Sequence, residues 1–168
     1  KLRQTAPQWY PLAAYLSGKG FDLYRNTALR YLPTGEAYLE DMLTTLDTAQ
    51  RFIFLEYFIM AEGEIWDRLS DILCRKSRQG VEVKLIFDDF GSMMRMPNEK
   101  IDALQDAGVE VRVFNPVHHY VNRLYFNYRD HRKITCVDGD IAYTGGANIA
   151  DEYANLIERF GYWKDCGL

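Results

Sequence analysis

The sequence lacks any apolar run of about 20 residues, the length that a helix needs to cross a bilayer. It has only three cysteines in 168 residues, Cys74, Cys136 and Cys166, and no CxxC pair. Without metal-ligand spacing, these thiols predict neither a metal site nor a disulfide framework, and they fit a reducing compartment. Low-complexity segments are also missing, and the 48% share of hydrophobic residues is ordinary for a domain that buries a core.

A basic surplus is missing as well. The chain has 24 acidic and 20 basic residues, which gives a formal net charge of -4. Proteins that bind nucleic acid non-specifically gain most of their affinity from basic side chains that neutralise phosphates. The charge balance therefore argues against a nuclease. Aromatic residues, at 14%, are abundant and fit either a packed core or a surface that contacts apolar material.

Helical and strand-like segments alternate from residue 36 onward. Apolar residues recur at i, i+3, i+4 and i+7 after Thr34, a candidate N-cap, so we expect a helix over 36–50. Further along we expect a strand over 51–59 covered on both faces, a helix over 65–79, a strand over 81–87, a helix over 97–107 and a strand over 109–114. This order is typical of βαβ units, which favour a parallel sheet between helices.

The two ends of the chain differ from this pattern. Residues 1–20 have little periodicity, and 21–35 contain two short strand-like pieces. Near the C-terminus, the Asp138-Gly139 pair predicts a tight hairpin between strands over 131–137 and 140–144. We therefore expect an α/β fold, with a mixed, mostly parallel β-sheet sandwiched by helices, in a single domain over 1–168. The abrupt ends suggest a fragment of a longer protein.

Residues 131–148, HRKITCVDGDIAYTGGAN, carry the polar pattern that points to chemistry. Period-two alternation in a strand would place His131 and Lys133 on one face, where both meet a phosphate. A neutral imidazole is a nucleophile, and an ammonium stabilises charge on phosphoryl oxygens. Gly145 and Gly146 would let a phosphate oxygen approach backbone N–H groups, and Asn148 would donate its amide to the same oxygen or cap a helix at 149–153.

The HxKxxxxD pattern followed by GGxN resembles the motif of the phospholipase D superfamily. Further segments, among them LPTGEAYLEDML, FIFLEYFI and GVEVKLIFDDFGS, look in order like the N-terminal catalytic half of bacterial cardiolipin synthases, over residues 30–166. The resemblance implies a catalytic set of His131, Lys133 and Asp138, with Asp138 orienting a neighbouring loop. The superfamily often has Ser where this chain has Gly146, and cardiolipin synthases commonly have Gly.

The resemblance also implies a reaction. His131 attacks a phosphatidylglycerol, releases glycerol and forms a phosphatidyl-histidine, which a second phosphatidylglycerol converts to cardiolipin. No metal or other cofactor is expected. The family needs two such motifs and this chain has one, so the partner is a second half of the parent chain or a homodimer mate. The implied location is the bacterial cell membrane, peripheral or anchored by other segments, with the catalytic domain in the cytoplasm.

Three acidic residues are candidates for supporting roles. Glu56 lies inside an apolar strand, where a structural network is the ordinary explanation. Asp88 lies at the end of a parallel strand, where open α/β sheets place ligand sites. Asp165 matches an acidic family position and is expected to hold the His131 imidazole.

A stretch of aromatic and basic residues precedes the motif, and we expect it either to rest on a membrane surface or to pack on protein. Its members are His118, His119, Tyr120, Arg123, Leu124, Tyr125, Phe126 and Arg129, of which the histidines are expected to face solvent without catalytic roles. Two alternatives to a transferase stay open. One is a phosphodiesterase or nuclease that acts as a homodimer, and the other is a lipid- or phosphate-binding half-domain without activity.

Overall fold

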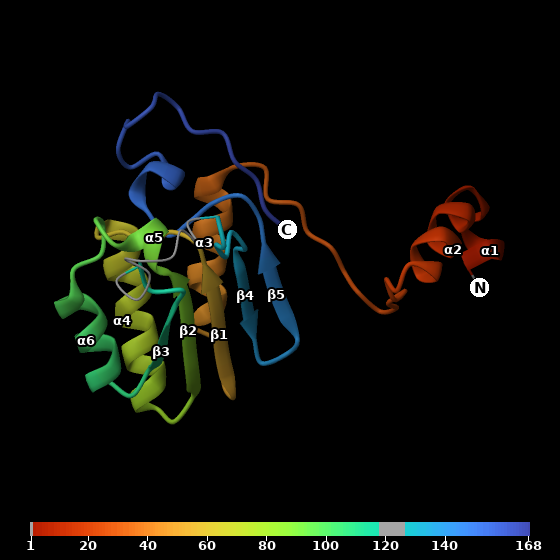
Figure 1. Ribbon diagram of the computed structural model, residues 1–168. Coiled ribbons are helices and arrows are strands. Elements are labelled where there is room, and N and C mark those ends of the chain that lie inside the picture. Colours follow the sequence, from red (N-terminus) through yellow and green to blue (C-terminus); the bar gives the residue numbers. More distant parts are fainter. Residues whose placement is uncertain (1, 118–126) are drawn as a thin grey trace. The chain divides into compact units, whose positions relative to one another are not determined.

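The computed structural model describes residues 2–117 and 127–168 (Figure 1). The expectations for 118–126 lie outside the described residues. The chain divides into two compact units, Lys1–Arg30 and Tyr31–Leu168, which are described separately. That they act as the single expected domain stays a prediction.

The unit Lys1–Arg30 is helical where the sequence showed little pattern. It contains α1 (Leu2–Thr5), the 3-10 turn η1 (Pro7–Trp9) and α2 (Tyr10–Gly18). Pro7 begins η1, a position where its missing N–H costs no hydrogen bond. The strand-like pieces expected over 21–35 do not form, and Leu32 makes only an isolated bridge to Gly167.

A five-stranded sheet forms the centre of Tyr31–Leu168, in the order β3-β2-β1-β4-β5. β1 (Phe52–Tyr57), β2 (Glu82–Asp88) and β3 (Glu110–Phe114) are parallel, whereas β4 (Ile134–Val137) and β5 (Ile141–Thr144) form an antiparallel hairpin beside β1. The helical segments are α3 (Gly35–Leu46), α4 (Glu64–Arg78), α5 (Asp89–Ser92), α6 (Asn98–Asp106) and η3 (Asp151–Ala154). The expected α/β class and mixed sheet are confirmed.

One face of the sheet carries the core. Side chains alternate along β1, so that Ile53, Leu55 and Tyr57 are buried and Phe52, Phe54 and Glu56 are only half-buried. Helices α3, α4 and α6 pack along the buried face, where their apolar stripes meet it (Figure 1). The expectation that this strand is fully covered on both faces was wrong, because every second side chain of β1 is only half-buried.

The ends of the elements follow local chemistry. The Thr34 hydroxyl accepts a hydrogen bond from Ala37 N at 3.2 Å, which confirms the N-cap of α3. This helix ends at Leu46, one turn earlier than expected, and β4 begins at Ile134 instead of residue 131. None of the helices in the described ranges is long and apolar enough to span a membrane.

Candidate functional site

His131 lies just before β4, beside the end of β1. Its ring centroid is 4.7 Å from that of Phe58, with the two planes tilted by 50°. Although its ring contacts Phe58, His131 is an exposed residue, so its imidazole is accessible to a reactant. Partial burial lowers the pKa of His131 and the Lys133 ammonium lowers it further, although Asp130 and Asp88 oppose them. A depressed pKa keeps the imidazole neutral at neutral pH, the form that acts as a nucleophile.

Lys133 is a buried cation, 5% exposed, on the same aromatic ring. Its Nζ lies 5.4 Å from the Phe58 ring centroid and donates to the His131 carbonyl oxygen at 2.7 Å. Burial lowers the pKa of Lys133, while the charges of Asp165 and Asp130 raise it. Within the described residues, Lys133 has no ion pair shorter than 4.0 Å. A buried ammonium without a close counter-ion favours binding of an anion.

Residues 131–133 precede β4, so strand alternation does not account for the proximity of the His131 and Lys133 side chains. Both side chains instead lie against the ring of Phe58. Asn148, near the end of the motif, binds the residue that follows Phe58. Its Oδ1 accepts from Ile59 N at 2.9 Å and its Nδ2 donates to the Tyr153 hydroxyl at 2.9 Å. The amide is buried and does not cap η3, whose N-cap is Ala150.

The glycine pair makes room for the C-terminal segment. A Cβ on Gly145 would lie 2.6 Å from the Cys166 carbonyl oxygen, and one on Gly146 would lie 2.2 Å from Asp165 Oδ1. Gly146 N donates to Cys166 O at 3.3 Å. This N–H is therefore occupied in the structure, unlike the free phosphate donor that we expected. In this chain a side chain at residue 146 would collide with the Asp165 carboxylate, so glycine fits this arrangement.

Asp165 is bound away from His131. Its carboxylate accepts from Cys166 N at 2.8 Å and from Trp163 Nε1 at 3.3 Å. No hydrogen bond joins it to His131 in the part of the chain that the structure describes, so the expected hold on the imidazole is not formed. Its charge acts instead on Lys133, whose pKa it raises.

Asp138 lies at the opposite end of β4 from His131, and its carboxylate binds backbone N–H groups. Its Oδ1 accepts from Arg51 N at 2.7 Å and Phe52 N at 2.8 Å, and its Oδ2 accepts from Gln50 N at 2.9 Å. These bonds fix the chain that enters β1 against the hairpin turn. These contacts fit the expected orienting of a neighbouring loop, and the place of Asp138 in the catalytic set stays a prediction.

We predict that Asp138→Asn lowers the melting temperature by about 5 °C at pH 7. Asn keeps the left-handed backbone at this position, φ 56°, but loses the charge and one acceptor. Backbone hydrogen bonds, led by that from Phe52, lower the pKa of Asp138, so its contribution is present above about pH 4 and is lost as the pH falls through the lowered value. The difference in melting temperature between the unmodified chain and Asp138→Asn should therefore be smaller at pH 3 than at pH 7. Asp140→Asn, in the same turn, is an exposed control. An equal melting temperature at pH 7 would refute the role.

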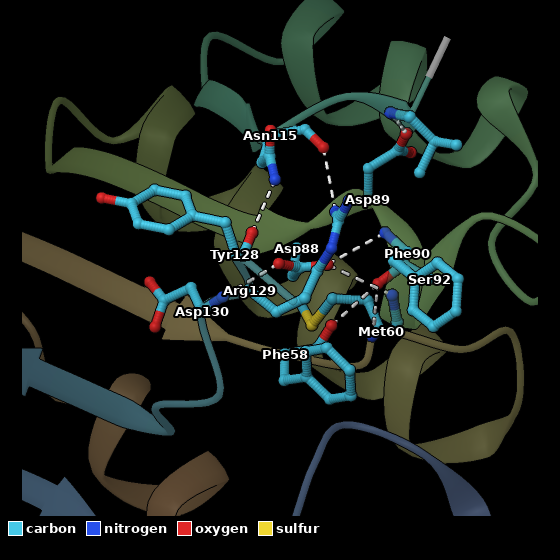
Figure 2. A network of polar contacts seen from close by, with 12 residues as sticks. Phe58, Met60, Asp88, Asp89, Phe90, Ser92, Asn115, Tyr128, Arg129 and Asp130 are labelled. Carbon is cyan, nitrogen blue, oxygen red and sulfur yellow. Dashed lines mark hydrogen bonds and ion pairs between the residues drawn. The ribbon is translucent and has the colours of Figure 1, made fainter. Parts of the chain in front are cut away.

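Asp88 is the centre of a buried polar network (Figure 2). Its Oδ1 accepts from Phe90 N at 2.9 Å, and its Oδ2 accepts from Asp130 N at 2.9 Å. Arg129 Nη1 lies 3.3 Å from Asp88 Oδ1 and donates to the Asn115 carbonyl oxygen at 2.9 Å. The network joins the ends of β2 and β3 to the segment that leads into His131. Arg129 is thus directed inward with a side chain 11% exposed, which for this residue fits the second alternative, packing on protein.

Glu56 takes part in a second cluster, on the open face of the sheet. Arg132 Nη2 lies 2.6 Å from Glu56 Oε1, and Arg132 Nε lies 2.9 Å from Asp130 Oδ1. A hydrogen bond with Asp130, together with burial, raises the pKa of Glu56 to about 7. Burial opposes ionisation of Asp130, but hydrogen bonds from Arg132 and Glu56 hold its pKa at about 2.

Two of the three supporting acids, Glu56 and Asp88, therefore converge on Asp130, which the sequence reasoning missed. Two signals were available: an acidic residue between basic neighbours in RDHRK, and its place directly before the candidate nucleophile. Phe58 was also missed, although it follows the carboxyl end of a parallel strand, where such sheets place their sites. No three His, Cys, Asp or Glu side chains gather as metal ligands anywhere in residues 2–117 and 127–168.

The sequence matches the family model for the phospholipase D-like domain of cardiolipin synthase over residues 42–157. A cardiolipin synthase of Oceanobacillus iheyensis is 38% identical over 156 residues, which are 93% of this chain and 30% of the relative. A cardiolipin synthase of Geobacillus kaustophilus is 38% identical over 166 residues, 97% of this chain and 32% of the relative. The chain thus spans about a third of the length of these relatives.

Solved structures share the fold. Nuc of Salmonella typhimurium, a phospholipase D family member, has a TM-score of 0.53 at 20% identity, over 82% of this chain and 76% of that protein. NucT of Helicobacter pylori has a TM-score of 0.56 at 12% identity, over 79% of this chain and 76% of that protein.

Proposed function

Because the chain belongs to the cardiolipin synthase family of phospholipase D-like domains, we propose that it is one catalytic half of a phosphatidyltransferase that makes cardiolipin from phosphatidylglycerol. The observation that carries the proposal is the arrangement of His131 and Lys133 on the Phe58 ring. It offers an exposed imidazole with a lowered pKa beside a buried cation.

In the first step, an imidazole nitrogen of His131 attacks the phosphorus of one phosphatidylglycerol. The bond from phosphorus to the glycerol oxygen breaks, and an acid in the second half of the enzyme protonates that oxygen. Lys133 stabilises the negative charge on the phosphoryl oxygens as the new phosphorus–nitrogen bond forms. Asn148 holds Ile59 in place and so fixes the end of β1 on which Phe58 lies.

In the second step, a hydroxyl of another phosphatidylglycerol attacks the phosphatidyl-histidine. The group that protonated glycerol now accepts the proton of this hydroxyl, and the phosphorus–nitrogen bond breaks to give cardiolipin and free His131. A second motif, in the remaining part of the parent chain or in a homodimer mate, supplies that group and further cationic charge. The 168-residue chain alone is therefore expected to be inactive as a monomer.

Product analysis tests the function. The complete parent protein is incubated with phosphatidylglycerol vesicles or with DNA, and the products are identified by mass spectrometry. Cardiolipin with one glycerol per turnover supports the proposal. Phosphatidic acid or cleaved DNA would instead support the phosphodiesterase alternatives, and wild-type activity in the isolated monomeric chain would contradict the need for a second motif.

We also propose that the protein works on an anionic membrane surface. The unit Lys1–Arg30 has five basic residues and one acidic residue, a formal charge of +4, while the other residues have 15 basic and 23 acidic ones, a charge of -8. Large side chains in this unit are exposed, among them Trp9, Leu12, Tyr15, Phe21 and Tyr24. Aromatic and basic residues together favour the interface of anionic bilayers, and each basic residue near it contributes about 1 kcal/mol.

We predict that the chain floats with vesicles that contain phosphatidylglycerol and much less with vesicles of phosphatidylcholine alone. Substituting Trp9 and Tyr15 together with Ser should reduce the bound fraction several-fold, whereas Phe160→Ser, another exposed aromatic change, should not. A parallel Tyr120→Ser and Arg123→Ser variant examines the aromatic stretch before the motif. Equal flotation of all variants would refute a membrane role for both segments.

A further inference from the structure

Asp130, the residue directly before His131, is fixed by hydrogen bonds of both its backbone N–H and its carboxylate. Its backbone N–H donates to Asp88 Oδ2 at 2.9 Å, from the end of β2. Its carboxylate receives two bonds from the Arg132 guanidinium, Nε to Oδ1 at 2.9 Å and Nη2 to Oδ2 at 3.1 Å. The residue is only 7% exposed, so its charge lies in a low-dielectric environment where it acts strongly on neighbours.

Glu56 completes the cluster from the end of β1. Its carboxyl group lies 2.6 Å from the same guanidinium, and the neighbouring Asp130 carboxyl raises the pKa of Glu56. Two carboxyl groups on one guanidinium disfavour joint ionisation, so the pKa of Glu56 is raised to about 7 while that of Asp130 is lowered. Near neutral pH the pair then includes a form in which Glu56 is protonated and Asp130 is ionised. In this form the cluster is neutral, because the Asp130 carboxylate balances Arg132. Loss of the Glu56 proton gives it a charge of -1.

We propose that Asp130 is a positioning residue for His131, because it fixes the backbone that carries the imidazole and places a carboxylate beside it, and that Glu56, bound to the same guanidinium as Asp130, modulates this charge. The activity part of this inference rests on the proposed function, but the charge relation does not.

The charged groups that act on the imidazole come from two segments. Asp130 and Lys133 flank it in sequence, and Asp88 acts from the end of β2. Arg129 is bound to Asp88, and Arg132 is bound to Asp130 and Glu56. The raised pKa of Glu56, about 7, places a change in the charge of the Glu56–Asp130 pair near neutral pH. Its titration should therefore be visible at His131.

Histidine titration in this 168-residue chain tests the proposal without any need for catalysis. The chain contains three histidines, and a His131→Gln variant assigns the His131 signals in ¹⁵N-resolved NMR spectra. We expect Asp130→Asn to lower the His131 pKa by roughly 0.5 units or more, since the carboxylate that favours the imidazolium is removed. Asp140→Asn, in the exposed hairpin turn, is the matched control and should leave the pKa unchanged.

Glu56→Gln gives a second test that does not depend on the stability of the Asp130 variant. The unmodified chain should show two inflections at His131, its own and a smaller one near pH 7 from the acid pair. Gln keeps a hydrogen-bond donor toward Asp130 but cannot ionise, so the inflection near pH 7 should disappear. Its persistence in Glu56→Gln, or an unchanged His131 pKa in Asp130→Asn, would overturn the proposal.

Kinetics of the complete parent protein give the third readout. If Asp130 acts through His131, Asp130→Asn lowers kcat about tenfold or more, changes KM less, and moves the acid limb of the pH–rate profile to lower pH. A cluster that serves only stability would leave that limb in place. If the parent makes no cardiolipin while the NMR shifts occur, the proposed function fails and the charge relation stands.

Discussion

Replacing His131 with alanine in the complete parent protein is expected to reduce cardiolipin formation by at least about 10⁴-fold. The variant loses the atom that bonds to phosphorus, and no other described side chain lies on the Phe58 ring with a lowered pKa and an exposed nitrogen. The fold should persist, because the imidazole is exposed and the residues around it keep their own hydrogen bonds.

The measurement is the initial rate of cardiolipin formation from phosphatidylglycerol vesicles, with a thermal scan to verify folding. His119→Ala is the control, since the sequence gives that histidine no catalytic role. The rate of the unmodified enzyme should also fall in acid, as the pH drops through the pKa of His131 and the imidazole becomes protonated. This pKa lies below the ordinary histidine value of about 6.5. A His131→Ala rate within a few-fold of the unmodified enzyme would remove the nucleophile from the account.

Replacing Lys133 with methionine is expected to lower kcat by about 10²–10³-fold while leaving stability unchanged or raised. The loss of rate follows from the missing charge beside the phosphoryl oxygens. The stability follows from burial, which lowers the pKa of Lys133 and so shows that folding disfavours the charged form. An ordinary structural residue would behave in the opposite way, with reduced stability and little specific loss of rate.

Lys84→Met is the matched control for this change. Lys84 also lies over a phenylalanine ring, 5.5 Å from the Phe54 centroid, but it is half-exposed and paired with Glu82 and Glu110. Steady-state kinetics and thermal scans of both variants separate catalysis from packing. If both variants lose the same modest amount of activity, Lys133 does not stabilise the transferred group.

Much of the fold could be predicted because its signals are local. The Thr34 cap, the apolar periodicity of α3 and α4 and the Asp138-Gly139 turn each depend on residues close in sequence, and each is found in the structure. The covering of β1 could not be predicted this way. An apolar strand with one polar residue fits burial on one face or two, and only its pairing partners decide which face the helices cover.

The candidate site was predictable in its residue types and less so in its contacts. His131 and Lys133 lie together, but through Phe58 rather than through strand alternation. Asp138 binds the backbone of residues 50–52, and the glycine pair lies against residues 165–167. These partners are distant in sequence, so no local pattern reveals them. For the same reason, the convergence of Glu56 and Asp88 on Asp130 required the three-dimensional structure.

Trapping the covalent intermediate tests the central claim most directly. The complete parent protein is mixed with phosphatidylglycerol, quenched in base to preserve phosphorus–nitrogen bonds, digested and analysed by mass spectrometry. We predict that a peptide with His131 gains the mass of a phosphatidyl group and that this adduct is absent after His131→Ala. An adduct on a histidine outside this chain, or turnover without any adduct, would contradict the assignment of His131 as the nucleophile.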